Sequence, residues 1–319
     1  MVDITIAIPT YNGATRLPAV LDKLQSQTGT EQINWEIMIV DNNSTDNTAD
    51  VVKNYQENWL DNVPLRYYLE TKQGAAFARK RAVQESTASL IGFLDDDTVP
   101  ALDWVKQAYQ FSQEHSQAGA FGSQVHGVYE VEPPPNFERI KAFLAITERG
   151  EQPLLYSPKN KLLPPSAGLV VRREAWLNCV PHHCILTGRV QGSMLTSEDL
   201  EMLSYIQQSE WEIWYNPSME IDHHIPKSRL EKDYLISLIQ GIGFSRYVTR
   251  MIGVKPIMKP ILTAAYLVND LRKILLHLLK YGNQMRTDLV PIVELELLTS
   301  SLLSPFYLWK NGYLNKKTQ

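Results

Sequence analysis

Strand-like runs alternate with helix-like runs along the first 225 residues, and this alternation limits the fold more than any other feature of the chain. Residues 4–8 form a β-branched run that ends at Pro9, and a helix-like pattern follows at 17–24. The further strand-like runs are 35–40, 65–69 and 90–94, and the further helix-like runs are 48–55 and 74–86. This order predicts an α/β fold, with a mostly parallel sheet and helices on both of its faces.

Clusters of polar residues begin where three of the strand-like runs end. They are Thr10-Tyr11-Asn12, Asp41-Asn42-Asn43 and Asp95-Asp96-Asp97. In an open parallel sheet, ligands bind in the crevice beyond the carboxyl ends of the strands. The sequence therefore predicts that these loops converge on one binding site.

The acidic triplet at 95–97 is a candidate metal site. Three adjacent carboxylates repel one another, which favours a divalent cation among them. A solvated acidic turn is the alternative for such a triplet in isolation, but the position directly after an apolar strand-like run favours the metal. Oxygen ligands of this kind indicate Mg²⁺ or Mn²⁺.

Two later groups are ambiguous when read from the residues alone. Asp199, preceded by Glu198, opens a helix-like run, where a carboxylate is either a general base or a charge that favours the helix dipole. His223 is either a metal ligand or a structural histidine, and Arg229 is a candidate for holding a phosphate.

Charge is distributed unevenly along the chain, which has a net charge of −4. Residues 1–225 carry 17 Lys and Arg against 29 Asp and Glu, whereas residues 226–319 carry 14 against 6. With two cysteines, the composition excludes a disulfide scaffold. The lack of a basic, apolar leader before residue 4 leads us to expect a cytoplasmic protein. The basic residues are interleaved with aliphatic helix-like runs, so we expect no nucleic-acid partner.

The basic tail is predicted to be helical, and we expect the catalytic domain at 1–228 and a C-terminal helical region at 229–319. We take Ile257–Tyr281 as its most apolar stretch, and charged residues such as Asp270 and Lys273 interrupt it. A membrane-spanning helix needs about 20 largely uncharged residues, so this stretch is not expected to span. An interfacial helix on the inner face of an anionic membrane, a helical subdomain and a dimer face all fit its pattern.

Together these pieces resemble the family 2 glycosyltransferases, which are inverting enzymes of the GT-A (Rossmann-like) fold. The resemblance covers about residues 3–250, and within the family the chain is similar to bacterial, including cyanobacterial, exopolysaccharide glycosyltransferases. The matching pieces, in the family's order, are Ile8 to Asn12, Val40 to Asp46, Gly74 through Ala78-Arg79, Phe93 to Asp97, Gly188-Arg189 onward to Glu198-Asp199, and His223 with Arg229.

The resemblance implies a role for each site residue. The residues it places at the nucleotide sugar are Pro9, Thr10, Tyr11, Asn12, Asp41, Asn43, Gly74, Arg79, Asp95, Asp96 and Arg229. The implied metal ligands are Asp97, Asp95 and His223, and the implied catalytic residues are Asp199 as the base and Glu198 beside it near the acceptor. Asn42 stands where the family often has a second aspartate, and this departure leaves the nucleotide's identity open.

The implied function is transfer of a sugar from a nucleotide-diphosphate sugar, with a UDP-sugar as the donor that the family pattern favours, to a glycan or lipid-linked acceptor hydroxyl in polysaccharide biosynthesis. A metal-dependent sugar nucleotidyltransferase is an alternative, although the glycine-rich, basic first loop usual in that class is absent from residues 9–14. A catalytically inactive scaffold that binds nucleotide sugars is the other alternative.

Overall fold

The computed structural model describes residues 2–158, 162–190 and 194–314. The chain forms two compact units, and each of them draws on three segments. The first unit consists of Met1–Val128, Ala145–Val180 and Met202–His224, and the second of Tyr129–Leu144, Pro181–Glu201 and Ile225–Gln319. The expected division into 1–228 and 229–319 stays a prediction.

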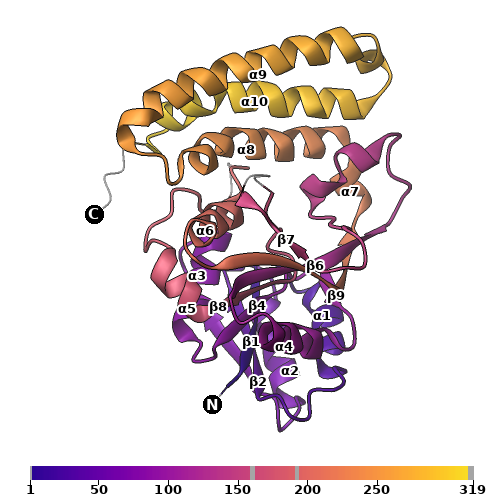
Figure 1. The fold of residues 1–319 in the computed structure, drawn as a ribbon. Helices are drawn as coiled ribbons and strands as arrows, with labels where there is room; N and C mark the ends of the chain where they lie inside the picture. The colour runs from indigo at the N-terminus through magenta and orange to yellow at the C-terminus, as the bar shows by residue number, and fades with distance from the viewer. Residues whose placement is uncertain (1, 159–161, 191–193, 315–319) are drawn as a thin grey trace. The chain divides into compact units, whose positions relative to one another are not determined.

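A nine-stranded sheet, as far as the described residues go, forms the centre of the first unit (Figure 1). Its strands run in the order β3-β2-β1-β4-β8-β6-β9-β5, and β7 pairs with β9. The strands are β1 (Ile4–Thr10), β2 (Trp35–Asp41), β3 (Leu65–Leu69), β4 (Leu90–Phe93), β5 (Thr98–Pro100), β6 (Ala118–Tyr129), β7 (Leu154–Leu155), β8 (Leu169–Arg172) and β9 (Glu212–Ile225).

The sheet has a parallel half and a largely antiparallel half. Strands β3, β2, β1 and β4 pair in parallel, whereas β8 is antiparallel to β4 and to β6, and β5 and β7 are antiparallel to β9. All seven residues of β2 are buried, as expected for a parallel strand covered on both faces. The predicted α/β fold is confirmed, and its parallel part is the half that the alternating sequence pattern covers.

The three helices predicted between the parallel strands follow β1 to β3 in the predicted order, and three more helices follow later in the chain. They are α1 (Leu17–Gln25), α2 (Thr48–Glu57), α3 (Ala75–Glu85), α4 (Trp104–Glu114), α5 (Arg173–Cys179) and α6 (Glu198–Gln207). Helix α1 buries Leu17, Val20, Leu21 and Leu24, which are the positions of its helical apolar repeat. Helix α3 packs against β1 and β2, and α2 against β2 and β3, so these helices fix the strand ends from which the polar loops leave.

The second unit is mainly helical and contains α7 (Lys227–Leu230), α8 (Lys232–Met251), α9 (Lys259–Tyr281) and α10 (Leu289–Lys310). Helix α10 packs against both α8 and α9 (Figure 1). Two glycines of α8 allow other segments to lie close to this helix. A Cβ on Gly241 would lie 1.8 Å from the Met194 carbonyl oxygen, and a Cβ on Gly243 would lie 2.4 Å from the Ser300 Cβ of α10. Leu186, Leu195, Val248 and Leu308 form an apolar cluster in this unit.

Helix α10 corrects one expectation about the tail. Among the described residues it is the helix whose length and apolar composition would suit a membrane span, and 39% of the qualifying stretch is buried within the protein. It is also more apolar than Ile257–Tyr281, because Glu294, Glu296 and Lys310 are its charged residues. By these criteria a long apolar helix of this kind can equally be the core helix of a water-soluble domain.

Candidate active site at the carboxyl ends of the parallel strands

The polar loops of the first unit leave adjacent strands. Thr10, the last residue of β1, lies opposite Asp41, the last residue of β2, in the parallel register. The Asn42 amide donates to the Thr10 carbonyl at 2.8 Å, and the Leu94 amide after β4 donates to the Ala7 carbonyl at 3.1 Å. The loops that follow β2, β1 and β4 therefore begin side by side.

Asp96, at the centre of the acidic triplet, is held from two directions. Its Oδ1 accepts from the Arg16 Nε at 2.8 Å, and its Oδ2 accepts from the Arg16 Nη2 at 2.8 Å and from the Thr10 hydroxyl at 2.6 Å. A bidentate guanidinium–carboxylate pair combines charge with fixed geometry. Both carboxylate oxygens of Asp96 therefore already accept hydrogen bonds from side chains of the protein. Arg16 is a site residue that the sequence analysis missed.

Gly13 explains how the acidic loop approaches the first strand so closely. A Cβ at this position would lie 2.1 Å from the Thr10 Oγ1 and 2.7 Å from the Asp96 Oδ2. Distances this short are not seen for real Cβ atoms, so a side chain here would separate Thr10 from Asp96. The glycine in the loop after β1 thus serves the carboxylate contact rather than a phosphate cradle.

The loops after β1 and β2 are joined by reciprocal hydrogen bonds. The Asn12 amide donates to the Ser44 hydroxyl at 2.9 Å, and the Thr45 amide donates to the Asn12 Oδ1 at 2.8 Å. Asn12 and Asn43 have φ values of 51° and 65°, a left-handed conformation that asparagine tolerates better than most residues. This conformation gives the predicted residues Asn12 and Asn43 a backbone role in the loops.

Asp41 uses both carboxylate oxygens within the first unit. Its Oδ1 accepts from the Ser44 amide at 2.8 Å, and its Oδ2 accepts from the Tyr67 hydroxyl at 2.7 Å. Burial raises the pKa of Tyr67, and the hydrogen bond to Asp41 raises it further. Each carboxylate oxygen has a second lone-pair site, so Asp41 retains the capacity to accept another hydrogen bond.

Asn42 ties the loop before α3 to the end of β2. Its side-chain Nδ2 donates to the backbone carbonyls of Glu70 and Lys72 at 3.2 and 2.8 Å, and its Oδ1 accepts from the backbone amide of Gly74 at 2.7 Å. Gly74 has a φ of 130°, which few other residues adopt, and it directly precedes the first residue of α3. The amide in place of the family's second aspartate is therefore a structural clamp on residues 70–74.

Arg79 reaches the acidic loop from α3. This side chain is 4% exposed, and its Nη2 lies 2.8 Å from the Ser166 hydroxyl and 3.4 Å from the Asp95 Oδ1. The pKa of Asp95 is raised, by burial in the first place and by the neighbouring carboxylates of Asp97 and Asp96, while Arg79 opposes the rise. The Arg79–Asp95 contact joins two of the predicted site residues.

Asp97 and His223 come together because strand β5 pairs with β9. Thr98 lies opposite His223 in the antiparallel register, and the His224 amide donates to the Asp97 carbonyl at 3.1 Å. The His223 Nε2 lies 3.7 Å from the Asp97 Oδ1, and the His223 side chain is buried, whereas His224 is exposed. The sequence alone would not reveal this pair, since its members are 126 positions apart along the chain.

The donor set at Asp97 fits a divalent cation that takes few protein ligands. One carboxylate and one imidazole leave coordination positions for phosphate oxygens and water, as is common for Mg²⁺ and Mn²⁺ sites. Within the described ranges, no group of three or more His, Cys, Asp or Glu side chains is arranged around a common metal position. Asp95, the third predicted ligand, lies beside Arg79, and its role as a ligand stays a prediction.

The remaining predicted residues belong to the second unit. Glu198 and Asp199 begin α6, and Ser197 before them has a φ of 72°, which is unusual for a residue other than glycine. Glu198 is buried, and Asp199 accepts from the Leu200 amide at 2.8 Å. Arg229 lies in α7. Part of the motif between Arg189 and Glu198, residues 191–193, lies outside the described residues.

Glu201, one turn into α6, was not singled out by the sequence analysis. It is fully buried, and its carboxylate accepts from the amides of Ile185 and Leu186 at 2.9 and 2.6 Å. Burial raises the pKa of Glu201, the charge of Glu198 adds to the rise, and the two amides oppose it. This carboxylate anchors residues 185–186 to the helix that carries Glu198 and Asp199.

The fold and the site define an α/β protein whose candidate active site lies at the carboxyl ends of parallel strands, with an acidic loop at its centre. The model of the family described as "Glycosyl transferase family 2" matches residues 5–180, which is more than half of the chain. The chain belongs to this family.

The chain is similar to several named proteins of this kind. It is 30% identical over 118 residues to the teichuronic acid biosynthesis glycosyltransferase TuaG of Bacillus subtilis (strain 168), a match that covers 37% of this chain and 45% of TuaG. The chain thus spans less than half the length of this relative.

Solved structures share the fold at low sequence identity. The mannosyltransferase PcManGT from Pyrobaculum calidifontis, solved with GDP-Man and Mn²⁺, has a TM-score of 0.62 and 18% identity, over 98% of this chain and 88% of that chain. S. aureus TarS 1-349, solved with UDP-GlcNAc, has a TM-score of 0.51 and 16% identity, over 97% of this chain and 92% of that chain.

Proposed function

We propose that this protein transfers a sugar from a nucleotide-diphosphate sugar to a hydroxyl of a glycan or lipid-linked acceptor in polysaccharide biosynthesis, with inversion at the anomeric carbon. The observation that carries the proposal is the Asp97–His223 pair beside the carboxyl ends of the parallel strands, in a chain of family 2. The nucleotide sugars bound by PcManGT and TarS support a donor of the same class. The name of TuaG supports a polysaccharide product.

The donor nucleotide would lie over the loops after β1 and β2. Tyr11, the residue directly after β1, is 43% exposed and so is accessible to a nucleobase. Asp41 would accept from the base or the ribose through its free lone-pair sites. Pro9, Thr10, Asn12, Asn43 and Gly74 would shape the pocket through the backbone.

The diphosphate would lie between the acidic loop and the cationic side chains. A divalent cation on Asp97 and His223 would neutralise charge that develops on the leaving nucleoside diphosphate. Arg79 would hold Asp95 in place and lie close to a phosphate or the base. Asp96, already bound by Arg16 and Thr10, would support the loop from behind. Arg229 would contribute a further cation to the diphosphate.

Asp199 would act as the general base and remove the proton of the acceptor hydroxyl as its oxygen attacks the anomeric carbon. Glu198 would lie beside the acceptor. The match of Glu198-Asp199 to the family motif carries these two assignments. A single displacement from an α-linked donor gives a β-linked product and needs no covalent intermediate.

Calorimetric titration of UDP tests the donor site. We expect binding in the presence of Mn²⁺ that is lost with EDTA and in the Asp97→Asn variant, which keeps the size of the side chain. Asp61→Asn, at an exposed position of the first unit, is the matched control and should bind as the unchanged protein does. Metal-independent binding, or equal binding by Asp97→Asn, would contradict the proposed metal site. Tighter binding of GDP than of UDP would indicate that the donor carries guanine.

Product analysis tests the reaction itself. Incubation with UDP-sugars and candidate acceptors should release UDP, and NMR of the product should show a β-linkage. Asp199→Asn should still bind UDP with Mn²⁺. It should form UDP from the UDP-sugar at least about a hundredfold more slowly, because general-base catalysis usually contributes a factor of at least this size. Donor binding without any release from a broad donor and acceptor panel would favour an inactive scaffold, and release of inorganic diphosphate would favour a nucleotidyltransferase.

A further inference from the structure

Helix α9 buries two titratable side chains and exposes several large apolar ones. Its buried positions include Asp270 and His277, which are 1% and 9% exposed, whereas Val268 and Leu279 are 69% and 84% exposed. A surface helix of a water-soluble domain normally buries its apolar stripe and exposes its charges. The outward face of α9 is therefore poorly matched to water.

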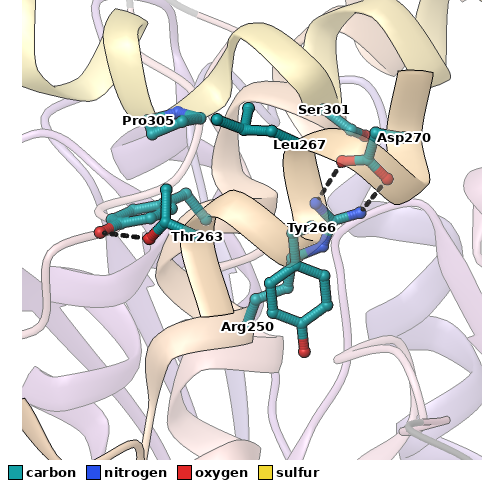
Figure 2. A pocket seen from close by; sticks show the side chains of 8 residues that line it. Arg250, Thr263, Tyr266, Leu267, Asp270, Ser301 and Pro305 are labelled. Atoms are coloured by element: carbon teal, nitrogen blue, oxygen red, sulfur yellow. Dashed lines mark hydrogen bonds and ion pairs between the residues drawn. The ribbon is translucent and has the colours of Figure 1, made fainter. Parts of the chain in front are cut away.

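The inward face of α9 combines Ile274 with Asp270 and His277, and the helices of the second unit satisfy the polar groups of these two residues. The Asp270 carboxylate pairs with Arg250 of α8 through both oxygens, and Figure 2 shows the two side chains pointing toward each other. The His277 Nε2 lies 2.9 Å from the Pro291 carbonyl of α10. Thr263, Ser301 and other residues line a small cavity at the same place (Figure 2). The buried polar side chains of α9 are thus bound by residues of α8 and α10.

The outward face carries a stripe of large apolar side chains. At helical spacing, positions 261, 268, 271, 275 and 279 fall on one side of α9. The exposed apolar residues of this helix are Ile261, Val268, Leu271, Leu275, Leu276, Leu278 and Leu279. Helix α10, which packs beside α9 (Figure 1), adds the exposed residues Leu303, Phe306 and Trp309. We call these residues of both helices the outer apolar face.

The charges beside the outer apolar face have one sign. The exposed charged residues of α9 are Lys259, Arg272, Lys273 and Lys280, and its one acidic residue, Asp270, is buried. On α10, Glu294 is paired with Arg139, and Glu296 accepts from Gln240 at 3.2 Å. Apolar side chains flanked by cations complement a membrane leaflet that contains anionic lipids.

A second copy of the chain fits this face less well than a membrane does. A two-fold dimer places the same patch against itself, so the four cations of α9 would meet the same four cations. The exposed part of α9 offers no carboxylate to pair with them. Lipid phosphates supply the missing negative charge.

We propose that the outer apolar face of α9 and α10 docks on an anionic lipid bilayer, with its leucines at the acyl boundary and its lysines and arginine at the phosphates. Arg272 and Lys273 lie near the middle of the 23-residue helix, where a spanning helix would place them at the costly centre of the bilayer. Helix α9 therefore lies in the plane of the interface. Trp309 and Lys310 end α10 with the residue types that anchor helices at a membrane surface.

Co-sedimentation of the 319-residue protein with vesicles tests this proposal. The vesicles are phosphatidylcholine alone and phosphatidylcholine with about 30 mol% phosphatidylglycerol. We expect binding to the anionic vesicles and much weaker binding to the neutral ones. Leu275→Asp should weaken partitioning to anionic vesicles by at least about tenfold, because it places a charge in the apolar face. Leu275 is 55% exposed, so its substitution should leave the circular dichroism spectrum and the thermal midpoint unchanged.

Leu177→Asp is the matched control, since Leu177 is 51% exposed on α5 in the first unit and is not one of the residues of the outer apolar face. It should bind anionic vesicles as the unchanged protein does. No sedimentation with either vesicle, or equal sedimentation of Leu275→Asp and the unchanged protein, would overturn the proposal. A dimer in analytical ultracentrifugation that Leu275→Asp dissociates, without vesicle binding, would assign the face to a second copy instead.

Discussion

Arg16 binds Asp96 through both carboxylate oxygens, with the Nε–Oδ1 and Nη2–Oδ2 distances both 2.8 Å. Arg16 directly precedes α1, whereas Asp96 follows β4, 80 residues later in the chain. The pair holds the middle of the acidic triplet against the end of β1, where Thr10 adds a third hydrogen bond. Asp95 and Asp97 are thereby held on either side of a fixed carboxylate.

Arg16→Gln should destabilise the first unit and disturb the acidic loop. Asp96 is 7% exposed, and the loss of the guanidinium would leave its charge with the Thr10 hydroxyl as the remaining side-chain partner among the contacts described above. We expect the free energy of unfolding to fall by roughly 1–3 kcal/mol and UDP affinity in Mn²⁺ to fall with it. Urea denaturation and calorimetry would measure the two effects.

Arg81→Gln is the control for Arg16→Gln. The Arg81 side chain is 39% exposed, as is that of Arg16, but its partner Glu85 lies one turn away on the same helix surface. Such surface pairs contribute about 0.3–0.5 kcal/mol, so the control should have little effect. Equal losses in the two variants would show that the Arg16–Asp96 pair has no special weight.

Asn42→Asp should loosen the loop before α3, although it restores a residue that the family often has. The substitution removes the donors to the carbonyls of Glu70 and Lys72 and sets a carboxylate against them. These carbonyls are partly buried, so their loss of a partner should cost about 1 kcal/mol, at the lower end of the range for buried groups. We expect a loss of this size in urea denaturation and faster hydrogen exchange at the Gly74 amide. Asn43→Asp, at the exposed neighbouring position, should change neither, and the reverse ranking would contradict the clamp.

The parallel half of the fold could be predicted because its signals are local. Apolar runs at 4–8, 35–40, 65–69 and 90–94 became β1 to β4, and the polar residues after them lie at adjacent strand ends. The antiparallel half could not be ordered in the same way. Strand β9 pairs with β5 across more than a hundred residues, and no turn or periodicity in the sequence records such a pairing.

The candidate site likewise has a part that the sequence predicted and a part that it did not. Asp97 and His223 were selected by resemblance, but the Arg16–Asp96 pair needed the three-dimensional register. An arginine before a helix is an ordinary surface residue in a sequence, and only the contact with the loop after β4 distinguishes it. The tail was harder still, because hydrophobic periodicity predicts a helix without saying which face its neighbours cover. Helix α9 buries the face that carries Asp270.

Stability of the second unit should depend on pH through Glu201. Because the pKa of this buried carboxyl is raised, the folded chain keeps a proton at pH values where the unfolded chain has lost it. The free energy of unfolding should therefore be highest below the ordinary glutamate value near 4.5 and fall as pH rises through the raised value. Glu201→Gln should flatten this part of the profile in urea denaturation between mildly acidic and neutral pH.

Two comparisons make the Glu201 result specific. Glu210→Gln, at an exposed position, should leave the pH profile as it is in the unchanged protein. Asp95, whose pKa is also raised, should make the same contribution to the pH dependence of the free energy of unfolding in both variants. A Glu201→Gln profile that runs parallel to the unchanged one at every pH would mean that Glu201 does not titrate in this window.

Asp270→Ala should strongly destabilise the second unit, because it removes the carboxylate that Arg250 binds inside the helical layer. Burial lowers the pKa of the nearby Arg246, and the charge of Arg250 lowers it further. Without Asp270, these two guanidinium groups would lose their shared counter-charge, at a cost of about 3–5 kcal/mol. Asp233→Ala, in the exposed first turn of α8, is the control and should cost less than about 0.5 kcal/mol. If Asp270→Ala unfolded at the same urea concentration as Asp233→Ala, the Asp270–Arg250 pair would contribute nothing to stability, and the burial of Asp270 on α9 would require another explanation.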